Sequence, residues 1–264
     1  MNQNYELIEK FDKDGDHFLT IAHRGASAYY PENTLSAFKA AIEMEADMME
    51  LDILLSKDGK IVVIHDETLD RTTNGSGLVA DQSLAELKQL DAGSWFAKKF
   101  KDEPIPTLRE ALELAKDSIY VNIEIKTEAV TDQPFGGIEE KALKLVDILQ
   151  MRDQVIFSSF DYRAITHLKQ IDPEIPVAVL YNKSQKNSLN PSALVDSLQV
   201  DGFNCSHKQL STKWMRNTNS AGIPVLVYTV NRELKMQTLI KRGVAGIFSD
   251  KPDMLKRVSQ QIAR

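Results

Sequence analysis

The sequence predicts a (β/α)8 barrel, the TIM-barrel fold, in which eight parallel strands form a closed ring inside a ring of helices. Three observations support this: the length, the alternation of strand-like and helix-like segments, and ionisable residues placed near strand ends. The chain has 264 residues, and a barrel of this class typically needs about 250. Its eight strand candidates exceed the about five or six of an open doubly wound sheet.

Short segments rich in β-branched and apolar residues predict the eight strands. They lie at 18–22, 48–54, 119–125, 155–158, 177–181, 202–205, 225–230 and 246–249. Apolar residues at helical spacing predict helices between most of them, at 34–45, 107–116, 139–149, 162–170, 210–221 and 232–242. Thr107 with Glu110 matches the capping box that begins a helix. No Pro/Ser-rich linker or long repeat marks a boundary, so we expect one barrel domain over residues 1–264.

One segment interrupts the alternation soon after the second strand. Residues 61–65 predict an extra strand, and about 66–106 form a long insertion in which Ser83 and Glu86 predict the start of a short helix. Long ordered connections of this kind in compact domains typically act as lids or binding elements. We therefore expect a small insertion that affects specificity.

The charge balance and the cysteine content limit the expected binding partners and the expected cellular location of the protein. The chain carries 32 Lys and Arg against 38 Asp and Glu, a net charge of −6, which argues against nucleic acid as a partner. Cys205 is the only cysteine, so no internal disulfide forms. The beginning of the chain lacks the apolar core of a secretory signal, and no run approaches about 18 apolar residues. We expect a cytoplasmic protein without stable membrane association.

Ionisable residues occupy two predicted strands in which apolar residues are the rule. Alternation of side chains along a strand places Glu50 and Asp52 on one face of the second strand, with apolar residues opposite. The same alternation groups Asn122, Glu124 and Lys126 on one face of the third. Strands of a barrel are covered on both sides, so these polar faces indicate a site inside the barrel.

The three carboxylates have two interpretations that spacing alone leaves open. Glu50, Asp52 and Glu124 offer only oxygen ligands, which suit one Mg²⁺ or Ca²⁺ ion better than structural zinc. Alternatively, they form a buried salt-bridge network with Arg24 and Lys126.

Two histidines lie at strand ends, where the active sites of these barrels are found. His23 and Arg24 end the first strand, and His65 ends the extra strand. Two imidazoles can serve as general base and general acid near neutral pH, and Arg24 with Lys126 can hold an anionic phosphate. This combination suits cleavage of a phosphodiester.

Short motifs in a fixed order connect these residues to a known family. They read Ala22-His23-Arg24-Gly25-Ala26, Pro31-Glu32-Asn33-Thr34, Glu50-Leu51-Asp52, His65-Asp66, Leu69-Asp70-Arg71-Thr72-Thr73-Asn74-Gly75, Ile123-Glu124-Ile125-Lys126 and Thr229-Val230-Asn231. Over about residues 18–255, the chain resembles the glycerophosphodiester phosphodiesterase (glycerophosphoryl diester phosphodiesterase) family.

The resemblance implies hydrolysis of glycerophosphodiesters, such as glycerophosphocholine or glycerophosphoethanolamine, to sn-glycerol 3-phosphate and an alcohol. It also implies one divalent metal ion, Mg²⁺ or Ca²⁺, and a small-molecule substrate as the partner. By matching motif, the acid/base pair is His23 and His65, the metal ligands are Glu50, Asp52 and Glu124, and the phosphate contacts are Arg24 and Lys126.

One residue departs from the family pattern. Many members have Trp where this chain has Tyr228 before Thr-Val-Asn, so we expect a changed wall of the glycerol or leaving-group pocket with the chemistry retained. Two rival functions remain at this stage. One is a lysophospholipase D-like hydrolysis of lysolipids, which needs an apolar rim, and the other is a non-catalytic phosphate-binding barrel.

Overall fold

The computed structural model describes residues 18–133, 135–185 and 189–262. Eight parallel strands form one ring, which closes because β1 pairs with both β2 and β9. In chain order they are β1 (Leu19–Ala22), β2 (Met48–Leu55), β4 (Tyr120–Ile125), β5 (Val155–Ser159), β6 (Val177–Leu180), β7 (Gly202–Ser206), β8 (Val225–Tyr228) and β9 (Gly246–Ser249). The predicted barrel is confirmed, and each predicted strand agrees with the structure to within two residues.

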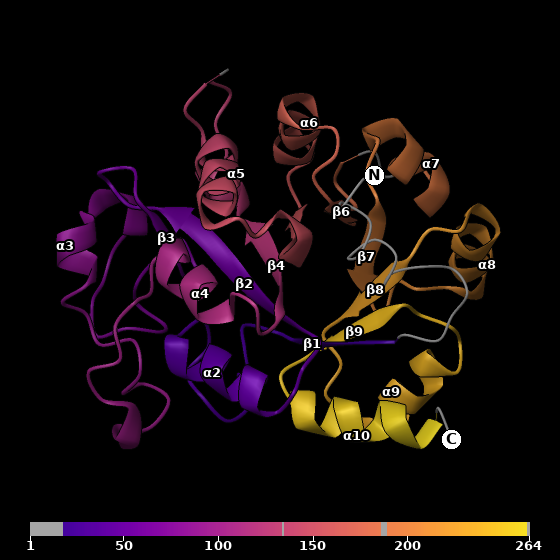
Figure 1. Cartoon of the computed structure of the whole chain (residues 1–264), viewed down its shortest axis with the longest axis horizontal. Helices are drawn as coiled ribbons and strands as arrows, with labels where there is room; N and C mark the ends of the chain where they lie inside the picture. Colours follow the sequence, from indigo (N-terminus) through magenta and orange to yellow (C-terminus); the bar gives the residue numbers. More distant parts are fainter. Residues whose placement is uncertain (1–17, 134, 186–188, 263–264) are drawn as a thin grey trace.

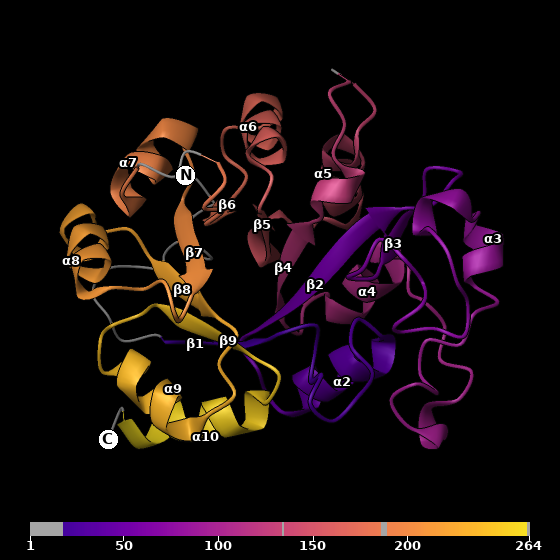
Figure 2. The ribbon, with the colours of Figure 1, turned by 180° about the vertical axis from the view of Figure 1, so that it is seen from behind.

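Helices surround the strands on all sides in Figures 1 and 2. They are α2 (Leu35–Glu43), α4 (Leu108–Ala115), α5 (Ile138–Leu149), α6 (Tyr162–Ile171), α7 (Pro191–Leu198), α8 (Thr212–Ala221), α9 (Glu233–Ile240) and α10 (Pro252–Ile262). Short 3-10 turns, η3 (Thr127–Ala129) and η4 (Arg152–Gln154), precede α5 and β5. In the described part of the chain, no helix is both long enough and apolar enough to cross a membrane.

Two of these helices, α7 and α10, were missing from the sequence prediction. The start of α7 is nevertheless marked in the sequence, because the side chain of Asn190 accepts the N–H of Ala193 and proline follows at the first helical position. The helix α10 also begins with a proline, Pro252, and packs against α9 and β1. Proline in the first turn was therefore a sign of a helix start that the sequence prediction did not use.

The predicted extra strand and insertion follow β2. The strand β3 (Ile61–Val63) pairs antiparallel with β2 outside the ring. Beyond it the insertion contains η1 (Val79–Asp81), α3 (Leu84–Leu87) and η2 (Lys98–Phe100), and it stands to one side of the barrel in Figure 1. The capping boxes predicted at Ser83 and Thr107 are both present.

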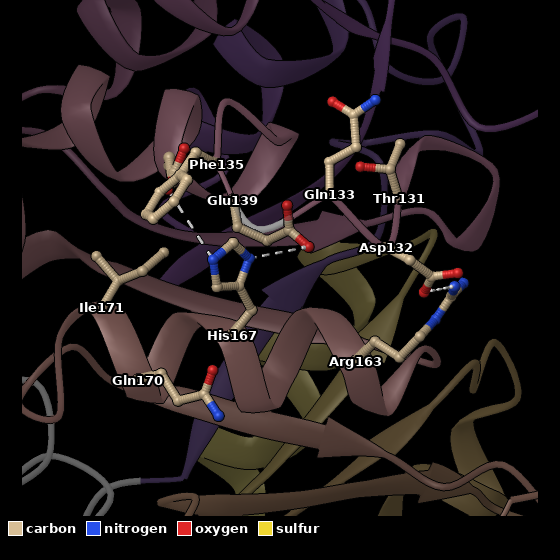
Figure 3. Close-up of a pocket in the computed structure, with 10 residues that line it drawn as sticks. Thr131, Asp132, Gln133, Phe135, Glu139, Arg163, His167, Gln170 and Ile171 are labelled. Atoms are coloured by element: carbon tan, nitrogen blue, oxygen red, sulfur yellow. Dashed lines mark hydrogen bonds and ion pairs between the residues drawn. The ribbon is translucent and has the colours of Figure 1, made fainter.

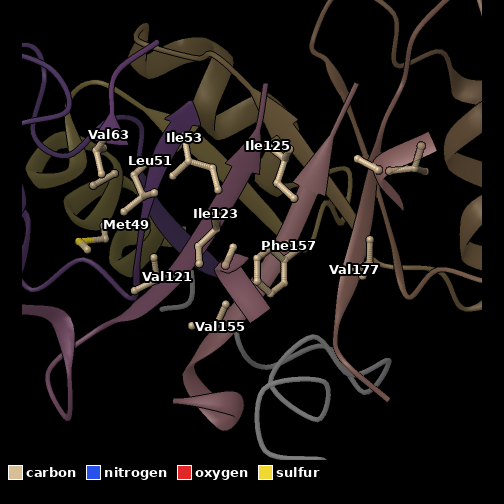
Figure 4. Close-up of a cluster of buried hydrophobic side chains, with 14 of the residues drawn as sticks. Met49, Leu51, Ile53, Val63, Val121, Ile123, Ile125, Val155, Phe157 and Val177 are labelled. Carbon is tan, nitrogen blue, oxygen red and sulfur yellow. The ribbon is translucent and has the colours of Figure 1, made fainter. Parts of the chain in front are cut away.

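Two apolar layers fix the direction in which each strand residue points. The outer layer, between strands and helices, includes Met49, Leu51, Ile53, Val121, Ile123, Ile125 and Phe157 (Figure 4). The inner layer, within the ring, includes Leu19, Ile21, Met48, Ile156, Ala178, Leu226 and Phe248. Residues alternate between the layers, so Glu50 and Asp52 face the interior. The parallel register then sets Glu50 beside Asn122 and Asp52 beside Glu124.

Candidate active site

A cavity of about 210 Å³ opens at the carboxyl ends of the strands. The residues that line it are His23, Arg24, Glu50, His65, Asn122, Glu124, Ser158, Phe160, Leu180, Tyr228, Thr229 and Phe248. Six of the eight site residues expected from the sequence are among them. The other two, Asp52 and Lys126, lie beside the lining residues and form ion pairs with them.

The three expected metal ligands converge. One ligand atom from each of Glu50, Asp52 and Glu124 lies within 4.8 Å of the others. They come from adjacent strands, β2 and β4, whose register brings their inward faces together. Among the described residues, these three carboxylates form the one group of three or more ligating side chains close enough to share an ion.

Asp52 is buried and well supplied with partners. Its carboxylate lies 3.4 Å from Nζ of Lys126 and 3.3 Å from Nε of Arg24, and it accepts a hydrogen bond from Nδ2 of Asn33 at 2.9 Å. Burial acts to raise the pKa of Asp52, but Lys126 and Arg24 outweigh it and hold the pKa at about 2. Asp52 is therefore ionised: it forms the ion pairs with Arg24 and Lys126 and also belongs to the carboxylate cluster that could hold a metal ion.

Glu50 is held differently. It accepts the backbone N–H of Arg24 at 2.8 Å, and no cationic side chain in the described ranges lies within ion-pair distance of it. Burial and the charge of Asp52 raise its pKa to about 8. Burial and Asp52 also raise the pKa of Glu124, although Nζ of Lys126 donates to it at 2.9 Å. A bound divalent cation would relieve this repulsion, so the all-oxygen donor set fits Mg²⁺ or Ca²⁺.

His23 is oriented by Asp250, which directly follows the last strand, β9. Its Nδ1 lies 2.7 Å from Oδ1 of Asp250, and Asp250 also accepts hydrogen bonds from Ser27 and Asn231. Burial acts to lower the pKa of His23, but the hydrogen bond to Asp250 and the charge of Glu50 outweigh it, so the pKa is raised. Sequence analysis missed Asp250, because a partner 227 residues away leaves no local pattern.

His65 has the same arrangement with a neighbour in the chain. Its Nδ1 lies 2.6 Å from Oδ1 of Asp66. Hydrogen bonds from Arg71 lower the pKa of Asp66 to about 2, against the effect of partial burial. Both histidines thus have Nδ1 engaged with a carboxylate, which leaves Nε2 of each ring as the nitrogen available to a substrate.

Arg24 lies where the chain turns out of β1. Its φ of 54° is in the left-handed region, and its Nη1 donates to Oε1 of Glu32 at 2.7 Å. Glu32 also pairs with Arg71 of the insertion. Glu32 and Arg71 stand in motifs noted in the sequence, but nothing there showed that they contact each other.

The opposite wall of the cavity is largely apolar. The rings of Phe160 and Tyr228 meet edge to face at 5.9 Å between centroids, and Tyr228 meets Phe248 at 6.4 Å. Leu180 completes this wall. Burial raises the pKa of the Tyr228 hydroxyl. Tyr228 therefore lines the cavity as expected. Leu180 and Phe248 were missed because inward-facing apolar residues of strands resemble ordinary core, and Phe160, which follows β5, gives no chemical signal of its own.

A larger and more open cavity, of about 500 Å³, lies between α5 and α6 (Figure 3). There His167 faces Glu139 at 3.9 Å, and Arg163 pairs with Asp132 at 2.6 Å. It contains none of the expected site residues. The chemistry-bearing groups are thus gathered in the smaller cavity at the barrel mouth.

Comparison with known proteins identifies the family of this chain. Residues 23–254 match the model of the glycerophosphoryl diester phosphodiesterase family. Glycerophosphodiester phosphodiesterase of Caldanaerobacter subterraneus subsp. tengcongensis is 41% identical over 238 residues, covering 90% of this chain and 96% of the relative. That of Bacillus subtilis is 37% identical over 260 residues, covering 93% of this chain and 87% of the relative.

A solved structure agrees with these relatives. It is a phosphodiesterase of Oleispira antarctica in complex with the product sn-glycerol-3-phosphate, and it matches with a TM-score of 0.80 at 33% identity, covering 91% of this chain and 96% of that one. The resemblance read from the motifs is confirmed by all three comparisons. The chain belongs to the glycerophosphoryl diester phosphodiesterase family.

Proposed function

We propose that this protein hydrolyses glycerophosphodiesters, such as glycerophosphocholine or glycerophosphoethanolamine, to sn-glycerol 3-phosphate and an alcohol. One observation carries the proposal: two histidines, each with Nδ1 bound to a carboxylate, line the same cavity as two members of the carboxylate cluster. The Oleispira antarctica relative, in complex with sn-glycerol-3-phosphate, supports the same product.

His23 and His65 act as the acid/base pair. Displacement at phosphorus requires a proton to leave the nucleophile and another to reach the oxygen of the departing alcohol. Asp250 and Asp66 hold Nδ1–H of each ring, so that Nε2 of one histidine accepts the first proton and Nε2 of the other donates the second.

Arg24 and Lys126 bind the phosphate, and the three carboxylates hold the metal. Glu32 and Asp52 fix the Arg24 guanidinium at the cavity edge, where it offers charge to a phosphoryl oxygen. Glu50, Asp52 and Glu124 would hold Mg²⁺ or Ca²⁺, which when bound draws charge from the phosphoryl group.

Tyr228 forms part of the wall against the organic portions of the substrate. Together with Phe160 and Leu180 it forms an apolar surface. These three side chains carry no charge that would select one particular alcohol. Recognition then rests on the shared glycerophosphate, and we expect several head groups to be accepted.

The direct test measures release of glycerol 3-phosphate from purified protein and glycerophosphocholine. We expect product with Mg²⁺ or Ca²⁺, loss of product with EDTA, and recovery on addition of either ion. A parallel arm uses a lysophospholipid. Product from the lysolipid alone would replace the proposal with lysophospholipase D-like activity, and saturable phosphate binding without turnover would replace it with a binding role.

A further inference from the structure

Arg71 joins two carboxylates that belong to different segments of the chain. On one side its Nε and Nη2 donate to the two carboxylate oxygens of Asp66, at 2.5 and 3.2 Å. On the other side Nη1 and Nη2 donate to the two oxygens of Glu32, at 2.8 and 2.7 Å. The planar guanidinium thus forms a bidentate pair of hydrogen bonds with each carboxylate, which a lysine cannot reproduce.

Each of these carboxylates in turn holds a residue that lines the cavity. Asp66 Oδ1 lies 2.6 Å from Nδ1 of His65, and Glu32 Oε1 lies 2.7 Å from Nη1 of Arg24. Arg71 itself is outside the cavity lining. Asp66 connects Arg71 to His65, and Glu32 connects it to Arg24.

The insertion that carries Arg71 has other attachments to the barrel. The ring of Phe100 packs against Tyr30 at 5.4 Å, and Nζ of Lys99 lies over both rings. Glu103 accepts the backbone N–H of Ser36 at the start of α2. These contacts do not involve Arg71, so truncating Arg71 should leave the insertion docked.

We propose that Arg71 is a positioning residue that sets the orientations of His65 and Arg24 together. The inference rests on the proposed function, because it assigns His65 to proton transfer and Arg24 to the phosphate. Through Arg71, the insertion after β3 contributes to the reaction although none of its residues from 67 to 106 lines the cavity. This contribution differs from the lid or specificity role expected from the sequence.

The test compares Arg71→Ala and Arg71→Lys with a matched control, Arg152→Ala. Arg152 also bridges two carboxylates, those of Asp147 and Asp172, and its side chain is 39% exposed against 44% for Arg71. It lies away from the cavity, in η4. We expect both Arg71 variants to lose kcat by at least about 10-fold, since small misplacements of reacting groups cost rates of this order. Arg152→Ala should keep the kcat of the unmodified protein, with a similar loss of thermal stability.

A double-mutant cycle with Asp66→Asn separates positioning from a general structural effect. If Arg71 acts through Asp66, the loss of kcat in the double variant will be smaller than the product of the two single losses. Retention of kcat within about twofold in folded Arg71→Lys, or strictly multiplicative losses, would overturn the inference. An unmodified protein without activity would instead contradict the proposed function. If Arg71→Ala does not fold, Arg71→Lys and Arg71→Gln supply the same comparison.

Discussion

The two walls of the cavity differ in how their side chains are held. On the wall from β1, β2, β3 and β4, charged groups contact further polar groups behind them, as His23 contacts Asp250 and Arg24 contacts Glu32. On the wall from β5, β6, β8 and β9, the side chains are mainly apolar and are held by ring contacts such as Phe160 with Tyr228. Proton transfer and phosphate binding need groups of fixed orientation, whereas the organic portion of a substrate needs a surface of suitable shape.

Removing an imidazole from the charged wall should have the largest effect. We expect His65→Ala to lower kcat by about 10²–10⁴-fold, because proton transfer is lost, while phosphate binding and the thermal unfolding temperature change little. His167→Ala is the matched control, since His167 also faces a carboxylate but lies in the outer cavity. Steady-state kinetics on both variants decides the matter; comparable kcat for His65→Ala and the unmodified protein would remove His65 from the mechanism.

Neutralising Glu50 should have an intermediate effect that differs with metal. Because the pKa of Glu50 is raised to about 8 from an ordinary 4.5, the folded metal-free protein binds a proton that the unfolded chain has released. The free energy of unfolding of the metal-free protein therefore falls as pH rises between about 4.5 and about 8, because the stabilisation from this proton is lost. We expect Glu50→Gln to flatten this fall and, above it, to raise the free energy of unfolding of the metal-free protein by about 1–3 kcal/mol.

The same variant should respond weakly to added metal. Thermal unfolding with and without Mg²⁺ or Ca²⁺ should show a rise for the unmodified protein and little rise for Glu50→Gln. Glu139→Gln is the control, because Glu139 is also buried but lies on α5 outside the cavity. An equal metal-induced rise in Glu50→Gln would exclude Glu50 as a ligand.

Changing the apolar wall should have the smallest effect on chemistry. We expect Tyr228→Trp to keep kcat within about threefold and to shift the ratio of kcat/KM between glycerophosphocholine and glycerophosphoethanolamine by about three- to tenfold, since reshaping an apolar pocket changes selectivity modestly. Tyr228→Phe separates the ring from its hydroxyl. A large fall in kcat for Tyr228→Phe would assign the hydroxyl to the reaction and make the two walls alike.

The charged wall was more predictable than the apolar one, for a physical reason. Carboxylates inside a covered strand are costly, so Glu50, Asp52 and Glu124 stand out against their apolar neighbours. Leu180 and Phe248 carry no such signal, because apolar side chains face inward in strands whether or not they meet a ligand. Strand alternation identified the inward face of β2, but the partner of Glu50 could not be read from it.

Partners brought together by the fold were beyond the sequence pattern. Asp250 lies against His23 through the closure of the ring, and Arg71 of the insertion donates to Glu32 in the loop after β1. Both depend on how distant segments pack. By contrast, Asp66 adjoins His65 in the chain and stands in the same motif, although sequence analysis assigned it no role.

The pairing of β1 with β9 has a consequence for the order in which a growing chain acquires its parts. Ala22 pairs with Ser249, so the residues that follow them, His23 and Asp250, meet when the ring closes. A nascent chain that has emerged only as far as β4 holds the three carboxylates but not the carboxylate that orients His23. The contact that orients His23 therefore forms only in a chain that extends to Asp250, because the first and last strands of the ring supply its two partners.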